Sequence, residues 1–183
     1  MSGKRVVITG AANGIGFATA AMFAANGAKV IGLDLDTSRQ AMRLIRCDLS
    51  KEADIIDAVA AAAGELGGID VLVNNAGVMQ EFSIQGITAE HIDRHFAINV
   101  RGAILVTREA LPHIGNGGRI INLASELAYL GRANTSVYCA TKAAMLGLTR
   151  SWARELAPRI LVNAVAPGPT DTALLGFESM TAE

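Results

Sequence analysis

Thr9-Gly10-Ala11-Ala12-Asn13-Gly14-Ile15-Gly16 is the stretch of sequence that decides the fold. It directly follows an apolar β-branched run, Val6-Val7-Ile8, and directly precedes an alanine-rich segment that predicts a helix. Glycines let a backbone approach a ligand closely, and the amides and positive dipole end of a helix N-terminus favour an anion. This order of elements favours a dinucleotide pyrophosphate, bound at Gly10, Asn13, Gly14, Ile15 and Gly16.

The glycine spacing is GxxxGxG, which differs from the GxGxxG of the common dinucleotide fingerprint. The pattern alone is therefore weak evidence, and the glycines could simply form a tight turn. Their position between a strand and a helix, where contact with phosphate requires them, favours the dinucleotide site.

Outward from this turn, short β-branched runs alternate with alanine-rich helical patterns along the chain. The runs are apolar nearly throughout, which is typical of parallel strands covered by helices on both faces. The expected strands are Arg5 to Thr9, Lys29 to Asp34, Arg43 to Cys47, Asp70 to Asn74, Arg119 to Leu123 and Ile160 to Ala164. The expected helices run from about Gly14 to Ala25, from the N-cap Ser50 to Leu66, from after Thr88 to His113, and from Ser136 to Leu156. The pattern predicts a doubly wound α/β fold, a Rossmann-type three-layer α/β/α arrangement with about six parallel strands.

No linker, repeat or low-complexity tract interrupts this pattern, so we expect one domain over residues 1–183. One connection is unusual, because only eight residues separate Asp34 from Arg43. A parallel crossover that contains a helix normally needs about a dozen. Either this crossover is a tight loop or the third strand is misplaced.

Composition excludes several classes of protein. The chain has 183 residues, 51% of them apolar, and a formal net charge of -1, so neither disorder nor general nucleic-acid binding is expected. No apolar run reaches the ~18 residues that a membrane helix needs, so no membrane association is expected. Cys47 and Cys139 are too few for a disulfide framework or a four-cysteine zinc site, and a reduced, cytoplasmic setting fits best.

Asp34 ends the second expected strand, 24 residues after Gly10. This is close to where an acidic residue meets the adenosine ribose in dinucleotide folds. A carboxylate there accepts hydrogen bonds from two ribose hydroxyls and repels the extra phosphate of NADP. No Arg or Lys lies in the glycine loop or in the two positions after Asp34 to offset that repulsion, so NAD is expected to be preferred over NADP. The alternative is a solvated turn aspartate, and Asp36 could take the same part.

Tyr138 and Lys142 lie four residues apart near the start of an expected helix, so both side chains project from one face. A phenol with a pKa of about 10 needs stabilisation of its phenolate by roughly 4 kcal/mol to titrate near neutral pH. An adjacent, partly desolvated ammonium group can supply much of this. Ser125 follows the fifth expected strand, at the sheet edge where ligands bind in open α/β folds, and its hydroxyl could hold a substrate oxygen. Taken singly, such residues more often pack, cap a helix or face solvent.

Together these motifs resemble the short-chain dehydrogenase/reductase family. The resemblance covers about Lys4 to Thr172 and rests on five motifs in order along the chain. They are Thr9 to Gly16, Asp48-Leu49, Asn74-Asn75-Ala76-Gly77, Ser125 with Tyr138 to Lys142, and Pro167-Gly168. The resemblance implies an NAD(P)-dependent oxidoreductase that interconverts a secondary alcohol and a ketone by hydride transfer.

The resemblance also implies a role for each matching residue. Tyr138 would exchange a proton with the alcohol or carbonyl, and Ser125 would orient the same oxygen. Lys142 would bind the nicotinamide ribose and lower the Tyr138 pKa, and Asn99 matches the asparagine that holds a water relay to the lysine. The further cofactor contacts implied are Asp48 with Leu49 near the adenine, Asn75, Ala76 and Gly77 beside the adenosine, and Pro167, Gly168, Thr170 and Thr172 in the segment that reaches the nicotinamide carboxamide.

The sequence departs from the family pattern in two places. Family members commonly have a helix between the second and third strands, and they normally continue well beyond the position of Thr172, whereas this chain stops at Glu183. An alternative function is therefore a non-catalytic dinucleotide-binding protein with an incomplete substrate pocket. An epimerase or dehydratase is disfavoured by the glycine spacing. The family also implies a homodimer or homotetramer joined through the two long helices, and a small alcohol or ketone as substrate.

His91 and His95 lie four residues apart on the third expected helix. A zinc-binding HExxH pattern needs Glu directly after the first His, where this sequence has Ile92, so no metal site is expected. We expect both imidazoles to lie on a solvated helix face.

Overall fold

Every pair of neighbouring strands is parallel in the computed structural model, which describes residues 1–39 and 41–172. Within these residues the sheet has the order β3-β2-β1-β4-β5-β6. The strands are β1 (Arg5–Thr9), β2 (Lys29–Asp34), β3 (Arg43–Arg46), β4 (Ile69–Asn74), β5 (Ile114–Leu123) and β6 (Ile160–Val165). This is the doubly wound, Rossmann-type order, so the predicted fold class is confirmed. Residues 40 and 173–183 of the single expected domain lie outside the described part of the chain.

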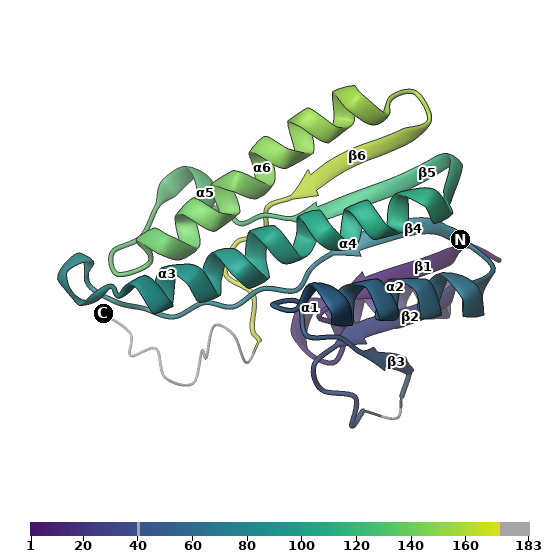
Figure 1. Cartoon of the computed structure of the whole chain (residues 1–183), viewed down its shortest axis with the longest axis horizontal. Helices are drawn as coiled ribbons and strands as arrows, with labels where there is room; N and C mark the ends of the chain where they lie inside the picture. Colours follow the sequence, from purple (N-terminus) through teal and green to yellow (C-terminus); the bar gives the residue numbers. More distant parts are fainter. Residues whose placement is uncertain (40, 173–183) are drawn as a thin grey trace.

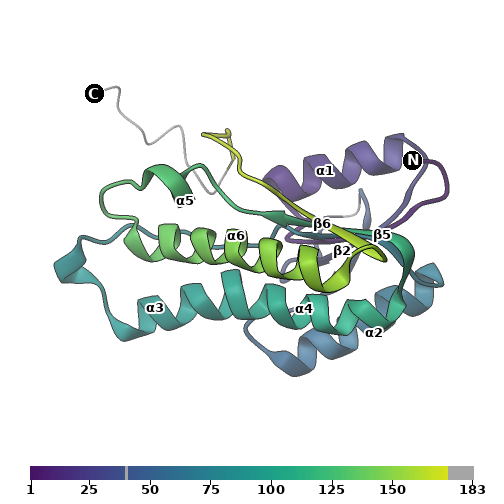
Figure 2. The same cartoon turned by 90° about the horizontal axis from the view of Figure 1, so that it is seen from above.

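Helices cover both faces of the sheet and complete the three layers (Figures 1 and 2). Figure 2 shows α1 on one face and α2, α4 and α6 on the other. The α-helices are α1 (Gly14–Ala25), α2 (Glu52–Leu66), α3 (Ala89–Phe96), α4 (Ala103–Ala110), α5 (Leu127–Leu130) and α6 (Ser136–Leu156). Because the chain moves outward from β1 in both directions, the strand order reverses between β1 and β4, and ligands of such sheets bind beside that point.

The central strand β1 is buried on both sides. Val7 packs into the core beneath α2 and α4, and Val6 and Ile8 pack into the core beneath α1. All three side chains are fully buried. This explains why the strand is apolar throughout instead of alternating.

The long helix expected from after Thr88 to His113 is confirmed in its extent, but its turns are not uniform. The chain forms α3, then a π-helical segment η2 (Ala97–Gly102), then α4, and ends in a 3-10 turn η3 (Leu111–His113). Gly102 packs so closely against Leu49 that a Cβ atom there would lie 3.0 Å from the Leu49 backbone oxygen. Widened turns of this kind often occur at functional sites, because they redirect side chains within a helix.

Two local expectations are resolved by the segment that follows β2. The crossover from β2 to β3 is a short loop without a helix over its described residues, and β3 pairs with β2 from Arg43, so the tight-loop alternative is confirmed. The expected N-cap Ser50 is wrong, since α2 begins after Lys51. The Ser50 hydroxyl instead donates to the Asp48 carboxylate at 2.6 Å.

In the described part of the chain, no helix has both the length and the apolar character to cross a membrane.

Candidate active site

A cleft of about 800 Å³ lies along the carboxyl ends of the strands and extends from the end of β2 to the start of α6. All but two of the predicted site residues line it. The two exceptions are Gly16 and Asn99, which lie behind its walls. Residues that are far apart in sequence are therefore brought to one surface, as expected for ligand sites at this edge of an open α/β sheet.

The glycine turn is packed too tightly for side chains. Gly10 has a φ of +67°, and a Cβ atom there would lie 2.8 Å from the Ala76 Cα atom. A Cβ atom at Gly16 would lie 2.0 Å from the Gly10 carbonyl oxygen. Asn13, the N-cap of α1, makes no capping hydrogen bond with its side chain, and the first turn contains no acidic residue. The first amides of α1 are thus not satisfied by the N-cap side chain, which fits an anionic group of a ligand.

The ends of β1 and β4 are joined beside this turn. The Asn75 side-chain amide donates to the carbonyls of Thr9 (2.9 Å) and Gly10 (3.0 Å). In return, the Thr9 hydroxyl accepts from the backbone N–H groups of Asn75 (3.0 Å) and Ala76 (3.1 Å). These bonds place the 75–77 segment as the floor of the cleft next to the glycine turn.

Asp34 ends β2 with its carboxylate held in place. Oδ2 accepts from the backbone N–H of Ala12 (2.8 Å), and Oδ1 accepts from that of Asp36 (3.1 Å). The Asp36 carboxylate instead accepts from Ser38 within its own turn, and Asp36 does not line the cleft. The geometry therefore favours Asp34 over Asp36 as the acidic residue of this site.

Arg39 is a cation near the glycine turn that the sequence analysis missed. Its guanidinium donates to the Asn13 side chain (3.3 Å) and lies 4.1 Å from the centre of the Phe17 ring. Arg39 lies five positions after Asp34, and the loop after β2 brings it back to the glycine turn. No local pattern indicates that return.

Asp48 and Leu49 line the cleft below β3. The Asp48 carboxylate accepts from the hydroxyl and the backbone N–H of Ser50 and lies 3.7 Å from the Lys51 ammonium. The hydrogen bond from the Ser50 hydroxyl contributes most to lowering the Asp48 pKa.

Ser125, Tyr138 and Lys142 meet in the part of the cleft formed by β5 and α6. All three side chains are at least nine-tenths buried. The Ser125 hydroxyl accepts from the Leu127 N–H (3.2 Å), which starts α5. The Lys142 ammonium donates to the carbonyl of Leu123, the last residue of β5 (2.8 Å), and lies 5.7 Å from the centre of the Tyr138 ring. The amine and the phenol thus share one side of α6, as their spacing predicts.

The pKa of Tyr138 differs from expectation. Burial raises it, and the neighbouring Ser125 hydroxyl opposes that effect. Burial also lowers the pKa of Lys142 to about 8. Desolvation of the phenolate therefore dominates the Tyr138 pKa in this structure, where the Lys142 ammonium is bonded to a carbonyl, and the lowering by Lys142 that the resemblance implies stays a prediction.

Asn99 lies in η2 and supports the cleft from behind. Its Oδ1 accepts from the Val78 N–H (2.8 Å), and its Nδ2 donates to the Val78 carbonyl (2.9 Å) and the Thr141 hydroxyl (3.1 Å). A Cβ atom at Gly77 would lie 3.4 Å from Asn99 Oδ1 and 3.5 Å from Lys142 Nζ. Asn99 therefore connects the floor of the cleft to α6 and lies close to Lys142 across Gly77.

The solvated helix face expected for His91 and His95 is wrong, since both imidazoles are buried. The segment after Gly77 folds over this face of α3. His95 Nε2 accepts from the Gln80 N–H (3.1 Å) and its Nδ1 donates to the His91 carbonyl (2.9 Å), which together define its neutral tautomer. Burial lowers the His95 pKa. No group of three or more potential metal ligands occurs among the residues that the structure describes.

Several residues that line the cleft were not predicted. They include Val78 after β4 and Arg94 of α3. Val78 directly follows Gly77, so its position alone could have indicated it. Arg94 had no such signal, because only the packing of α3 brings it to the cleft.

Comparison with known proteins agrees with this arrangement. Residues 4–182 match the family model described as short chain dehydrogenase. Galactitol 2-dehydrogenase of Agrobacterium fabrum is 40% identical over 185 residues, which cover 93% of this chain and 72% of that protein. The crystal structure of 3-ketoacyl-(acyl-carrier-protein) reductase from Brucella melitensis complexed with NADH superposes with a TM-score of 0.89 at 37% identity, over 95% of this chain and 79% of that one.

A second solved structure, a short chain dehydrogenase from Burkholderia cenocepacia in complex with NADP, has a TM-score of 0.90 at 38% identity. It is matched over 94% of this chain and 77% of that one. The motifs, the fold and the match to the family model therefore agree, and this chain belongs to the short-chain dehydrogenase family of oxidoreductases.

Proposed function

We propose that this chain is an NAD-dependent oxidoreductase that interconverts a secondary alcohol and a ketone, with Tyr138 as the acid and base. The observation that carries the proposal is the placement of Ser125, Tyr138 and Lys142 in the same cleft as the glycine turn. A dinucleotide bound at the turn could then reach the three side chains along one continuous surface. The name of the galactitol 2-dehydrogenase relative supports a secondary alcohol as the class of substrate.

The residues of the cleft fit a nicotinamide dinucleotide. The amides at the start of α1 would hold the pyrophosphate, Asp34 the adenosine ribose, and Lys142 the nicotinamide ribose. The remaining contacts would come from Asp48 and Leu49 near the adenine, Asn75, Ala76 and Gly77 beside the adenosine, and Pro167, Gly168, Thr170 and Thr172 near the carboxamide. When bound, the nicotinamide supplies the acceptor or donor of the hydride. The relatives solved with NADH and with NADP support this class of cofactor.

Asp34 supports a preference for NAD. Its carboxylate is held by two backbone N–H groups, and the 2′-phosphate of NADP would bring further negative charge to the same place. Arg39 beside Asn13 acts in the other direction, because a guanidinium attracts phosphate. The preference for NAD over NADP therefore depends on two opposed effects on the 2′-phosphate, which are repulsion by the Asp34 carboxylate and attraction by the Arg39 guanidinium.

Tyr138 moves the proton of the reaction. When the alcohol is oxidised, its carbon loses a hydride and its hydroxyl loses a proton, which Tyr138 accepts while Ser125 donates a hydrogen bond to the same oxygen. Because burial raises the Tyr138 pKa, the phenol is protonated at neutral pH and is ready to act as the acid in ketone reduction. Oxidation requires the phenolate, so its rate should rise with pH. Lys142 favours the phenolate while its own ammonium is charged, which is below about pH 8.

Asn99 is a positioning residue in this scheme. Its side chain forms hydrogen bonds with Val78 and Thr141, the neighbours of Gly77 and Lys142, and thereby fixes the positions of these two residues relative to one another.

The chain should act as a homodimer or homotetramer. Ile92 and Phe96 of α3 and Ile104 of α4 are exposed apolar side chains on the helices that the family uses as an interface. Light scattering of the purified protein tests this, and a monomer at micromolar concentration would contradict it.

The test of the function has two measurements. Fluorescence titration gives the Kd of NADH, and absorbance at the NADH band follows turnover with a panel of secondary alcohols and ketones. We expect both binding and turnover. NADH binding without turnover of any substrate would instead indicate a non-catalytic dinucleotide-binding protein.

A further inference from the structure

Glu126 is a charged residue of the cleft that the proposed proton transfer does not use. It directly follows Ser125 and is half-buried. Its backbone N–H donates to the Pro167 carbonyl (3.0 Å), and its own carbonyl accepts from the Tyr129 N–H (2.9 Å). Backbone contacts therefore set the place of Glu126, and none of them engages its carboxylate.

The carboxylate lies against Gly168. A Cβ atom at Gly168 would lie 3.1 Å from Glu126 Oε2, so the carboxylate takes the space that a side chain there would need. Gly168 belongs to the segment after β6 that also lines the cleft. Glu126 thus bridges the two walls of the cleft beside the serine that would hold the reacting oxygen.

No hydrogen bond or ion pair to the Glu126 carboxylate occurs among residues 1–39 and 41–172. The nearby cation Arg132 is paired with Glu81 instead. A carboxylate in the cleft without a partner in the protein can accept a hydrogen bond from a donor that a ligand brings to it. An alcohol substrate brings hydroxyl groups.

We propose that Glu126 selects the class of substrate, neutral polyhydroxylated alcohols, by accepting a hydrogen bond from a hydroxyl on the carbon next to the reacting carbon. This inference rests on the proposed function and names the substrate class of the same site. Ser125 and Glu126 are consecutive and both line the cleft, so one substrate can contact both side chains. A hydrogen bond to a charged acceptor is stronger than one to a neutral acceptor, and the same charge repels substrates that carry a carboxylate nearby.

The sharpest test compares 2,3-butanediol, as each stereoisomer, with 2-butanol. The two alcohols share the carbon skeleton and the reacting group and differ by one adjacent hydroxyl. We expect the diol to have the higher kcat/KM in the unmodified chain. The ratio of the two kcat/KM values should fall about 10-fold in Glu126→Ala, which is the low end for a hydrogen bond to a charged group. It should fall less in Glu126→Gln, whose amide oxygen still accepts.

Glu155 of α6 provides the matched control. It is exposed and does not line the cleft, so Glu155→Ala and Glu155→Gln should leave the ratio unchanged. Thermal unfolding followed by circular dichroism confirms that each variant is folded, and Glu126→Gln keeps the test valid if Glu126→Ala does not fold.

Three outcomes are decisive. An unchanged ratio in both Glu126 variants overturns the proposal. A loss of NADH affinity in place of the change in ratio also overturns it, because Glu126 would then belong to the nicotinamide site. If the unmodified chain turns over no alcohol, the proposed function fails. The role of Glu126 is then tested by the affinity of the diol for the complex of the chain with NADH. Weakening of that binding about 10-fold by Glu126→Ala would support Glu126, and no difference would overturn it.

Discussion

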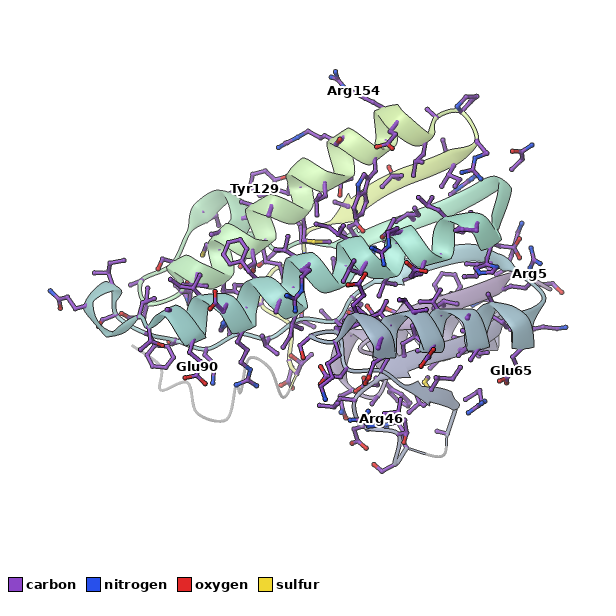
Figure 3. The ribbon with its side chains drawn as sticks, in the orientation of Figure 1. Arg5, Arg46, Glu65, Glu90, Tyr129 and Arg154 are labelled. Atoms are coloured by element: carbon purple, nitrogen blue, oxygen red, sulfur yellow. The ribbon has the colours of Figure 1, made fainter. Side chains whose placement is uncertain are left out.

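The amino and carboxyl edges of the parallel sheet hold charged side chains in opposite ways. At the amino edge, where β1 and β4 begin, the Arg5 guanidinium donates to both oxygens of Asp70, each at 2.9 Å. Figure 3 labels Arg5 at this edge of the sheet. The Arg5 backbone N–H adds a third bond at 2.8 Å, and these contacts lower the Asp70 pKa to about 2. At the carboxyl edge, the buried Lys142 ammonium contacts a carbonyl, and over the described residues it pairs with no carboxylate.

We interpret this difference as a division of roles, in which the amino edge stabilises the fold and the carboxyl edge binds a ligand. The Arg5 and Asp70 charges pair with one another, so they stabilise the folded chain without any bound ligand. The Lys142 charge, in contrast, is held in the folded state at a cost, which its lowered pKa reports. Unpaired charge in a cleft is typical of functional sites, and each of the following changes tests this contrast.

The largest effect should come from the carboxyl edge. Tyr138→Phe removes the proton acceptor but keeps the ring, so kcat should fall by about 10² to 10⁴, the range for general acid and base catalysis. The Kd of NADH should stay nearly constant. Steady-state rates and fluorescence titration measure the two quantities. Tyr129→Phe is the control, because Tyr129 is exposed on α5 and lies outside the cleft lining. If Tyr138→Phe retains most of its activity, the assigned proton transfer is wrong.

The cost of the Lys142 charge should appear in stability. Below about pH 8 the folded state carries a buried ammonium, whereas the unfolded lysine stays charged up to its ordinary pKa of 10.5. The unfolded state therefore binds more protons between these pH values, and the stability of the unmodified chain rises with pH in that window. Relative to Lys142→Met, its free energy of unfolding should increase by about 3 kcal/mol from pH 7 to 10.5.

Urea unfolding of the ligand-free proteins measures this difference. Lys29→Met replaces an exposed lysine at the start of β2 and should show no such pH dependence. If the difference in free energy of unfolding between Lys142→Met and the unmodified chain does not change with pH, burial of the Lys142 charge does not destabilise the folded state.

The choice between NAD and NADP should change by a smaller amount. Asp34→Ala removes the carboxylate that opposes the 2′-phosphate, so the ratio of the two Kd values should move toward NADP by about 10-fold, or 1.4 kcal/mol. Arg39→Ala in the same background should then weaken NADP binding and leave NAD binding nearly unchanged. An unchanged ratio in Asp34→Ala would remove Asp34 from this role.

The smallest effect belongs to the amino edge. Asp70→Asn should destabilise the chain by about 1 kcal/mol at neutral pH, because a partly buried charged hydrogen bond becomes a neutral one. Since the folded-state pKa of Asp70 is lowered to about 2, this contribution is present above about pH 4 and is lost as the pH falls toward 2. Values of kcat/KM should not change. If Asp70→Asn lost activity at unchanged stability, the amino edge would also serve function, and the proposed difference between the two edges would be wrong.

The elements closest to the predictions are those with a local signal. The bounds of β1, α1, β2 and α6 agree with the sequence analysis, because β-branched runs mark the two strands, alanine-rich sequence marks α1, and Pro158 follows the end of α6. The π-helical segment η2 within the expected third long helix was not predicted. Its cause is tertiary, since Gly102 packs against Leu49 and Asn99 bonds to Val78 and Thr141, residues that no helical pattern connects.

The sequence by itself determined the succession of strands and helices along the chain, the glycine turn and the shared face of Tyr138 and Lys142, because spacing along a strand or helix sets these features locally. Only the tertiary structure decided which groups lose contact with water. It buried His91 and His95, returned Arg39 to Asn13, placed Glu126 against Gly168 and raised the Tyr138 pKa. Burial and desolvation depend on segments that fold over a residue from elsewhere in the chain, and so the spacing of neighbours does not contain them.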